Sequence, residues 1–275
     1  MSCFICVTCG VQFAPGDAEP DHCPVCEDGR QYVGWDGQRW TTLEALRAGH
    51  ANRLEELEPG LTGIGTEPSF GIGQRALLVE TPEGNVLWDC ITLLDEATVA
   101  AVRRLGGIVA IAISHPHYYS SMVEWSSEFG APIHLHDADR RWVMRPDPSV
   151  HFFSGDELAM PGGLRLLRLG GHFPGATVLH WPAGAGGRGA LLSGDTIQVV
   201  FDRRWVSFMY SFPNLVPLPA HVVERMVRRV GDLRFDRIYG AWWDRVVDRD
   251  GVAAVRRSAE RYLAALAWEG EEVEL

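Results

Sequence analysis

The sequence lacks two features that would define its surroundings: a long hydrophobic run and an excess of basic residues. No apolar stretch approaches the roughly 18 residues that a membrane-spanning helix needs. The formal net charge is -11, with 25 lysine and arginine residues against 36 aspartate and glutamate residues. Binding to phosphate backbones or anionic lipids needs a positive field, which this balance does not supply. We therefore expect neither nucleic acid nor a membrane as a partner.

The chain also lacks a secretory signal and a dinucleotide-binding loop. Its first residues, MSCFIC, have no basic start followed by an apolar core, so we expect a cytoplasmic protein. The glycine-rich stretch 184–189 has neither the spacing nor the position of a loop that binds a flavin or a nicotinamide. In a reducing compartment, the six cysteines are expected to be metal ligands or free thiols and not disulfides.

Four of these cysteines form two Cys-x-x-Cys knuckles at the N-terminus. Cys6 and Cys9 make the first knuckle, and Cys23 and Cys26 make the second, with thirteen residues between them. Gly10, directly after Cys9, permits the tight turn that a knuckle needs. Four thiolates close a tetrahedral site, which stabilises a fold and leaves no position for a substrate.

Two alternatives for this module stay open at the level of sequence. Cys3 is in phase with Cys6, so Cys3 and Cys6 compete with Cys6 and Cys9 as the first knuckle. The segment resembles a zinc ribbon and also a short rubredoxin-like centre, and thiolates bind both metals. We expect structural zinc, with iron as the alternative. A module this small has too little core to fold without its metal.

The chain divides into three predicted segments. Residues 1–40 form the metal-binding module, and its last part, 31–40, reads as a hairpin around Asp36-Gly37. Residues 41–59 contain a short helix that starts near Thr42 and a polar linker, 51–60. Residues 60–275 form the large domain, with the boundary placed near Pro59.

Histidines follow two predicted strands of the large domain. The β-branched run 108–113 leads into His115 and His117, and the strand 164–169 leads into His172. Asp195 follows a third strand, 189–192. Three histidines and one aspartate, each at a strand end near glycine or a tight turn, predict a shared metal site.

The order of these motifs resembles that of the metallo-β-lactamase superfamily. A strand with His-x-His, then Gly-His-x-x-Gly, then Ser-Gly-Asp covers the chain from about Leu61 onward. Val86 to Cys90 resembles that family's strand ending in an acidic residue, here Asp89, which supports the metal loop from behind. Further strands are predicted at 74–81, 85–89, 132–136, 176–181 and 235–239, and helices at 94–105, 120–129, from 137, after Pro219 to about 230 and at 252–266. Together with the resemblance, they indicate an α/β fold, the four-layer αββα sandwich.

The sequence departs from the family motif His-x-His-x-Asp-His at its last two places. Tyr119 and Ser120 stand there, and the segment 238–244 after the last strand holds no histidine. Phenol and hydroxyl groups bind divalent metals poorly at neutral pH. By resemblance, His115, His117, His172 and Asp195 would then hold a single Zn or Fe ion, while Trp242 and Trp243 would fill the space of the second.

A single-metal site of this kind favours hydrolysis of a small ester, thioester or lactone. Asp195 would ligate the metal or hold the attacking water, Tyr119 or Tyr118 would donate a proton or hydrogen bond, and Asp89 would orient a ligand. A catalytically degenerate binding protein and an iron redox protein are the alternatives. The aromatic segment 205–216 fits a pocket wall as well as a core or an oligomer interface, so a homo-oligomer stays open. His134 and His136 are expected to be core or rim residues.

Overall fold

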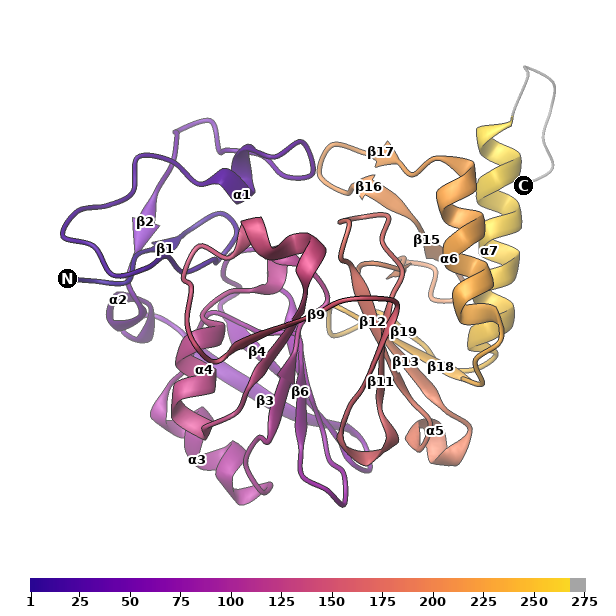
Figure 1. The fold of residues 1–275 in the computed structure, drawn as a ribbon, viewed down its shortest axis with the longest axis horizontal. Coiled ribbons are helices and arrows are strands. Elements are labelled where there is room, and N and C mark those ends of the chain that lie inside the picture. Colours follow the sequence, from indigo (N-terminus) through magenta and orange to yellow (C-terminus); the bar gives the residue numbers. More distant parts are fainter. Residues whose placement is uncertain (268–275) are drawn as a thin grey trace.

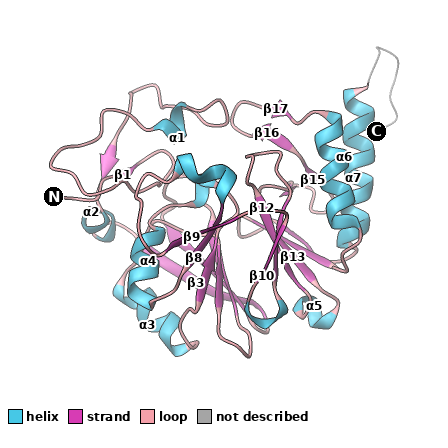
Figure 2. Cartoon of the chain, viewed as in Figure 1, coloured by secondary structure: helices cyan, strands magenta, loops and turns pink. Residues whose placement is uncertain are grey.

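The computed structural model describes residues 1–267, so the last eight residues of the predicted large domain lie outside the described part. Two β-sheets lie face to face, and helices cover the outer face of each (Figures 1 and 2). Helices α3 (Glu96–Arg104) and α4 (Met122–Phe129) cover one sheet, and α6 (Ala220–Gly231) and α7 (Gly251–Leu266) cover the other. The predicted αββα sandwich is confirmed. None of the described helices combines the length and the apolar character needed to cross a membrane.

The first sheet has seven strands, and each lies beside its neighbour in sequence. Its strands are β3 (Ala51–Glu58), β4 (Leu61–Glu67), β5 (Arg75–Val79), β6 (Val86–Trp88), β7 (Ala110–Ala112), β8 (Ile133–His136) and β9 (Val150–Phe153). The pairs from β3 to β6 are antiparallel, and those from β6 to β9 are parallel. The parallel half places the carboxyl ends of β6, β7 and β8 at one edge, where Asp89 and the His115 loop begin.

The second sheet has six strands. They are, in spatial order, β10 (Glu157–Ala159), β11 (Arg165–Arg168), β12 (Thr177–Trp181), β13 (Ala190–Gly194), β18 (Arg237–Gly240) and β19 (Val246–Val247). The loop after β11 carries His172, and β13 ends next to Asp195. Apolar side chains of both sheets, among them Leu77 and Trp88 from the first and Leu166 and Leu179 from the second, form one buried cluster between them.

Short elements complete the chain. They are β1 (Ile5–Cys6) with β2 (Trp40–Thr41), β14 (Gln198–Val199) with β15 (Val206–Ser207), β16 (Met209–Ser211) with β17 (Val216–Pro217), helices α1 (Pro24–Glu27), α2 (Leu43–Arg47) and α5 (Gly184–Gly187), and 3-10 helices η1 (Pro116–Tyr118), η2 (Asp137–Trp142) and η3 (Pro161–Gly163). The helix predicted from 137 is therefore a 3-10 helix.

The covering helices follow the rules from which they were predicted. Asp95 caps α3, because its carboxylate accepts a hydrogen bond from the Thr98 N–H at 2.7 Å. Helix α6 buries Val223, Met226 and Val230, which recur at helical spacing on one face. That face packs against the second sheet, in the apolar cluster that α6 and α7 form with it.

The predicted linker at 51–60 was wrong, because residues 51–58 form the edge strand β3. Its residues pair with β4 from Ala51–Glu67 to Glu58–Leu61. The polar composition misled the prediction because only one face of an edge strand needs apolar residues, and charged residues on such an edge are usual. Leu54 packs on the core, while Arg53 and Glu55 are exposed. The first sheet therefore begins at Ala51 and not beyond Pro59.

The predicted hairpin at 31–40 was also wrong. A turn does occur, with the Gly37 N–H donating to the Gly34 carbonyl at 2.9 Å. Only Trp40 and Thr41 enter a strand, and they pair with Cys6 and Ile5. The Gln31 carbonyl instead accepts a hydrogen bond from the Asn214 side chain, so the segment is held by the large domain and not by its own cross-strand pairs.

The N-terminal module packs directly on the large domain. The Gln12 N–H donates to the Ser120 carbonyl, and the Ala14 N–H donates to the Met144 carbonyl, both at 3.1 Å. Thr92 donates its hydroxyl to the Gly10 carbonyl at 2.9 Å. The four knuckle cysteines share one buried cluster with side chains of the first sheet. The module is thus a continuation of the large domain's core.

Two candidate metal centres

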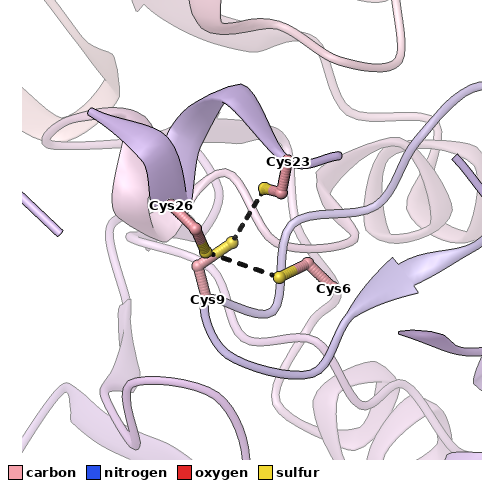
Figure 3. A group of neighbouring side chains, drawn as sticks. All are labelled: Cys6, Cys9, Cys23 and Cys26. Atoms are coloured by element: carbon pink, nitrogen blue, oxygen red, sulfur yellow. Dashed lines mark hydrogen bonds between the residues drawn. The ribbon is translucent and has the colours of Figure 1, made fainter. Parts of the chain in front are cut away.

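The first centre is the four-cysteine cluster of the N-terminal module (Figure 3). The Sγ atoms of Cys6 and Cys26 lie 3.5 Å apart, and those of Cys9 and Cys23 lie 3.8 Å apart. Burial raises the pKa of the Cys9 thiol well above its usual range, so a cation is needed to keep four buried thiolates charged. Cys3 lies outside the cluster, so the alternative first knuckle, Cys3 with Cys6, was wrong.

Two further groups support the first knuckle. Gly10 has a φ of 79° and donates its N–H to the Cys6 carbonyl at 2.8 Å, which is the tight turn expected after Cys9. The Gln38 side-chain amide donates to Cys6 Sγ at 3.0 Å. An amide donor at a ligand sulfur stabilises its negative charge. Gln38 belongs to no motif and was not predicted as part of this centre.

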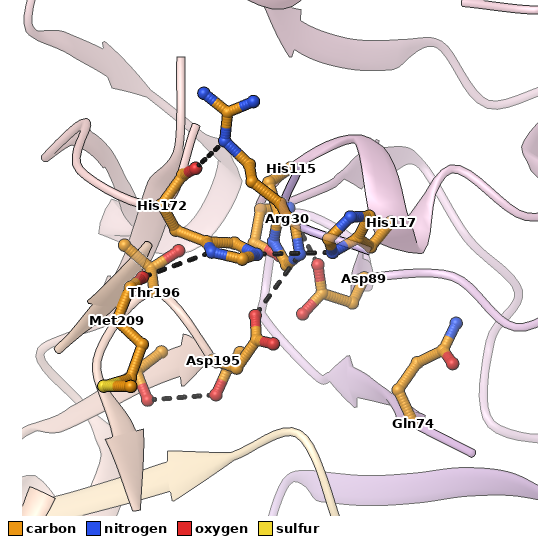
Figure 4. Close-up of polar contacts among 12 residues, drawn as sticks. Arg30, Gln74, Asp89, His115, His117, His172, Asp195, Thr196 and Met209 are labelled. Atoms are coloured by element: carbon orange, nitrogen blue, oxygen red, sulfur yellow. Dashed lines mark hydrogen bonds and ion pairs between the residues drawn. The ribbon is translucent and has the colours of Figure 1, made fainter. Parts of the chain in front are cut away.

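The second centre lies where β7 of the first sheet and β11 and β13 of the second sheet end (Figure 4). Strand β7 leads to His115, η1 holds His117, and the loop after β11 holds His172. His172 Nε2 lies 3.2 Å from His117 Nδ1, and His115 Nε2 lies 3.3 Å from Asp195 Oδ1. The three histidines each offer a nitrogen within 4.8 Å of the others. The structure therefore brings together the three predicted histidines and sets Asp195 beside one of them.

Hydrogen bonds indicate which ring nitrogen of His172 and of His115 is free to bind a metal ion. His172 donates Nδ1–H to the Tyr210 carbonyl at 2.9 Å, which leaves Nε2 without a proton. His115 Nδ1 lies 2.8 Å from Ser114 Oγ. Ser114 Oγ can accept the His115 Nδ1–H, and in that tautomer Nε2 of His115 carries no proton. Both Nε2 lone pairs then face the centre, as metal ligation requires.

The residues at this centre fit a bound divalent cation. His115 Nε2 and Asp195 Oδ1 are buried and have no hydrogen-bond partner among the described residues. Burial, reinforced by the neighbouring imidazoles, lowers the pKa of His115 and of His117 well below the usual value, so both rings are neutral. Burial raises the pKa of Asp195. A bound cation would give both His115 Nε2 and Asp195 Oδ1 the partner that each of them lacks.

Asp89 lies directly behind the histidine loop. Its carboxylate accepts the Ser114 N–H at 2.7 Å, and the hydroxyl of Ser114 connects it to His115. Burial raises the pKa of Asp89 to about 7, although the two hydrogen bonds from Ser114 lower it in part. The backbone of Gly194 passes close to both residues: a Cβ there would lie 3.0 Å from Ser114 Oγ and 3.1 Å from Asp89 Oδ2.

We expect Gly194→Ala to lower the free energy of unfolding by about 2–4 kcal/mol. Its φ of 55° is strained for alanine at about 1–2 kcal/mol, and the new methyl group would press on Asp89 and Ser114. Gly130→Ala is the matched control, because Gly130 has a φ of 67° but no atom within 4 Å of a Cβ. Urea unfolding at a fixed metal content measures both. Equal losses in the two variants would contradict a close approach at Gly194.

Of the two neighbouring tyrosines, Tyr118 lies at the centre. Its ring centroid is 4.4 Å from that of His115. Burial, followed by the nearby Asp195 carboxylate, raises the pKa of Tyr118, and its hydroxyl has no hydrogen-bond partner in the described chain. Burial, followed by the Asp139 carboxylate, raises the pKa of Tyr119. The predicted proton-donor role of Tyr119 stays a prediction, and these contacts favour Tyr118 for it.

Ser120, which stands at the last place of the family motif, is bonded to a side-chain amide. Gln74 donates its side-chain amide to Ser120 Oγ at 3.1 Å and to the Cys90 carbonyl at 2.9 Å. Filling by Trp243 was wrong, because a Cβ at Gly63 or Gly65 would lie 2.8 Å from its ring, which therefore packs on strand β4. Trp242 donates its indole N–H to the Ile72 carbonyl.

The aromatic segment 205–216 forms a wall of this centre. Strands β16 and β17 make a short antiparallel pair, and the Tyr210 carbonyl in β16 accepts from His172. The Phe212 ring lies 5.7 Å from the His172 ring. His136 is satisfied as expected, since Nε2 lies 2.9 Å from the Gly155 carbonyl and Nδ1 accepts from Ala138.

Two residues at the centre were missed by the sequence analysis. Arg30 of the module donates its Nε–H to the His172 carbonyl at 2.5 Å. Asp139 accepts the Gly175 N–H at 2.9 Å, and burial raises its pKa to about 6. Neither belongs to a motif, and each contacts a segment far away in the sequence, so composition and spacing carried no signal for them.

The family model of the metallo-beta-lactamase superfamily matches residues 71–250. The chain belongs to the metallo-β-lactamase superfamily. The uncharacterized protein YmaE of Bacillus subtilis (strain 168) is 52% identical over 268 residues, 97% of each chain. The metallo-β-lactamase DIM-1 superposes with a TM-score of 0.58 at 14% identity, over 79% of this chain and 98% of its own. The mono-zinc form of FIM-1 from Pseudomonas aeruginosa gives 0.57 at 14%, over 77% and 96%. These structures share the metallo-β-lactamase fold with this chain.

Proposed function

We propose that this chain is a metal-dependent hydrolase with one metal ion in the large domain, acting on a small ester, thioester or lactone. The observation that carries the proposal is the convergence of three neutral imidazoles beside a free carboxylate, in a chain where Tyr119 and Ser120 stand at the motif places of a second ion's ligands. The mono-zinc form of FIM-1, a protein with the same fold, supports a single-ion site.

The residues have distinct tasks in this proposal. His115 Nε2, His117 Nδ1 and His172 Nε2 would hold the ion. When bound, such an ion lowers the pKa of a water molecule to about 7 and polarises a carbonyl oxygen. Asp195, 3.3 Å from His115, would ligate the ion or orient the water and accept its proton. The free Tyr118 hydroxyl would donate a hydrogen bond to the oxygen on which charge develops.

A non-catalytic binding protein is the second candidate, and the depth of the centre favours it. The side chain of His115 is fully buried, and that of Asp195 is 7% exposed, whereas a hydrolase must admit its substrate. Turnover separates the two candidates. The iron redox alternative predicts visible absorbance in aerobically purified protein.

Elemental analysis of the purified chain tests the proposal. We expect two metal ions per chain in the natural protein and one in His117→Ala, because the four-cysteine centre keeps its own ion. His134→Ala is the control. The His134 ring lies 6.0 Å from the ring of His151 and is not part of the histidine centre, so the variant should keep both ions. The same preparations are assayed with p-nitrophenyl acetate and a thioester. A natural protein with one ion, or with two ions and no turnover on any ester, thioester or lactone, contradicts the hydrolase.

A further inference from the structure

The four-cysteine module reaches the histidine centre through one side chain. Arg30 lies four residues after the ligand Cys26 and donates its Nε–H to the backbone carbonyl of His172 (Figure 4). This contact joins residues 142 positions apart in the sequence. A residue held by the first centre therefore touches a ligand residue of the second.

Arg30 is held on several sides. Its guanidinium lies 4.5 Å from the centroids of both the Phe173 and the Tyr210 rings. Asp28 pairs with it at 2.6 Å, and the side chains of Arg30 and Asp28 are 10% and 15% exposed. A guanidinium that packs on two aromatic rings and pairs with a carboxylate has little rotational freedom. Arg30 is thus a rigid contact for the carbonyl of His172.

The same segment also holds the residue on the other side of the His172 ring. Ser211 donates its hydroxyl to the Arg30 carbonyl at 3.0 Å, and Asn214 donates its amide to the Gln31 carbonyl at 3.1 Å. Ser211 is the last residue of β16 and Asn214 follows it, and the Tyr210 carbonyl of this strand accepts the Nδ1–H of His172. The carbonyl and the imidazole of His172 are consequently both held by groups that depend on residues 28–31.

We propose that Arg30 is a positioning residue for the metal ligand His172, and that it makes metal affinity at the histidine centre depend on the metal in the four-cysteine module. The proposal rests on the proposed single-ion site. Cys26 ends the second knuckle within α1, so an ion there fixes the start of residues 28–31. Loss of that ion frees the segment, and His172 loses its donor and the support of Tyr210.

Metal affinity of the histidine centre, measured by competition with a chromophoric chelator, tests the positioning role. We expect Arg30→Gln to weaken zinc binding at this centre by about 10-fold to 100-fold, the usual range for a group that orients a ligand. Arg30→Lys keeps the charge but loses the planar Nε donor, so it should recover little of the loss. Thermal unfolding of each variant checks that it folds.

Arg145→Gln is the matched control. Arg145 also joins the module to the large domain, because it bonds to Gln12 and pairs with Glu124, and its side chain is 19% exposed. It does not belong to the segment around His172. We expect a less than threefold change in affinity for this variant. Equal effects of the two substitutions would mean that any loosened docking contact suffices, and the role of Arg30 would be refuted.

A double-mutant cycle tests the dependence on the module. Cys23→Ser should weaken the histidine centre by about 10-fold when Arg30 is present and by clearly less in the Arg30→Gln background, where only the support of Tyr210 through the backbone carbonyls of residues 30 and 31 is left to lose. Additive losses would refute the coupling through Arg30. A natural protein that binds no metal at the histidine centre would overturn the proposed function and this inference together, whereas normal binding with unchanged affinity in Arg30→Gln would overturn the inference alone.

Discussion

His115→Ala is expected to lower kcat/KM for an ester or thioester substrate by about 10³-fold or more. The substitution removes one of three imidazoles and the hydrogen-bonded chain to Ser114 and Asp89, so an activated water would no longer form at neutral pH. Asp195 would also lose the group that lies 3.3 Å from it. Steady-state kinetics, together with the metal content of the same sample, measures the effect.

His180→Ala controls for the loss of a buried imidazole. His180 lies in β12, 5% exposed, with Nε2 2.9 Å from the Arg234 carbonyl, and it takes no part in the histidine centre. We expect kcat/KM within a few-fold of the natural protein, with some loss of stability. Turnover by His115→Ala at the natural rate would exclude the histidine centre as the site of reaction.

Cys23→Ser is expected to unfold the N-terminal module while the large domain stays folded. A structural zinc ion contributes on the order of 10 kcal/mol to the fold of such a module, and the remaining three buried thiols cannot replace a fourth ligand. Hydrogen exchange should show loss of protection at β1 and β2, where Cys6 pairs with Trp40. Amides of β5 to β7 should exchange as in the natural protein.

Cys3→Ser is the matched control, because Cys3 is a half-exposed thiol outside the cluster. Its protection pattern should equal that of the natural chain. If Cys3→Ser opened the module as Cys23→Ser does, the ligand set would have to include Cys3. If neither did, the module would fold without its metal.

The fold could be predicted from the sequence where a functional motif directly follows a regular strand. Each histidine motif follows a predicted strand, and the resemblance to the superfamily implied that Asp89 lies behind the His115 loop. Strand β3 could not be recognised, because an edge strand with Arg53 and Glu55 on its exposed face has the composition of a linker.

The finer features of the site were beyond the sequence for a different reason. Whether Tyr118 or Tyr119 faces His115 depends on the direction of side chains in a single 3-10 turn, which spacing does not fix. The departure from the family motif at Tyr119 and Ser120 was visible in the sequence, but the bond between Gln74 and Ser120 joins two loops 46 residues apart. Arg30 acts across 142 residues, where no local pattern exists.

The hydrogen bonds between the module and the large domain limit how the two parts can evolve separately. Gln12 and Ala14 bond to backbone carbonyls of the large domain, and the knuckle cysteines complete its buried apolar cluster. A gene fragment that encoded residues 60–267 alone would leave that surface open to water and would lack β3. The two parts are therefore expected to be inherited as one unit, and shuffling the module onto another member of the superfamily would not carry its effect along.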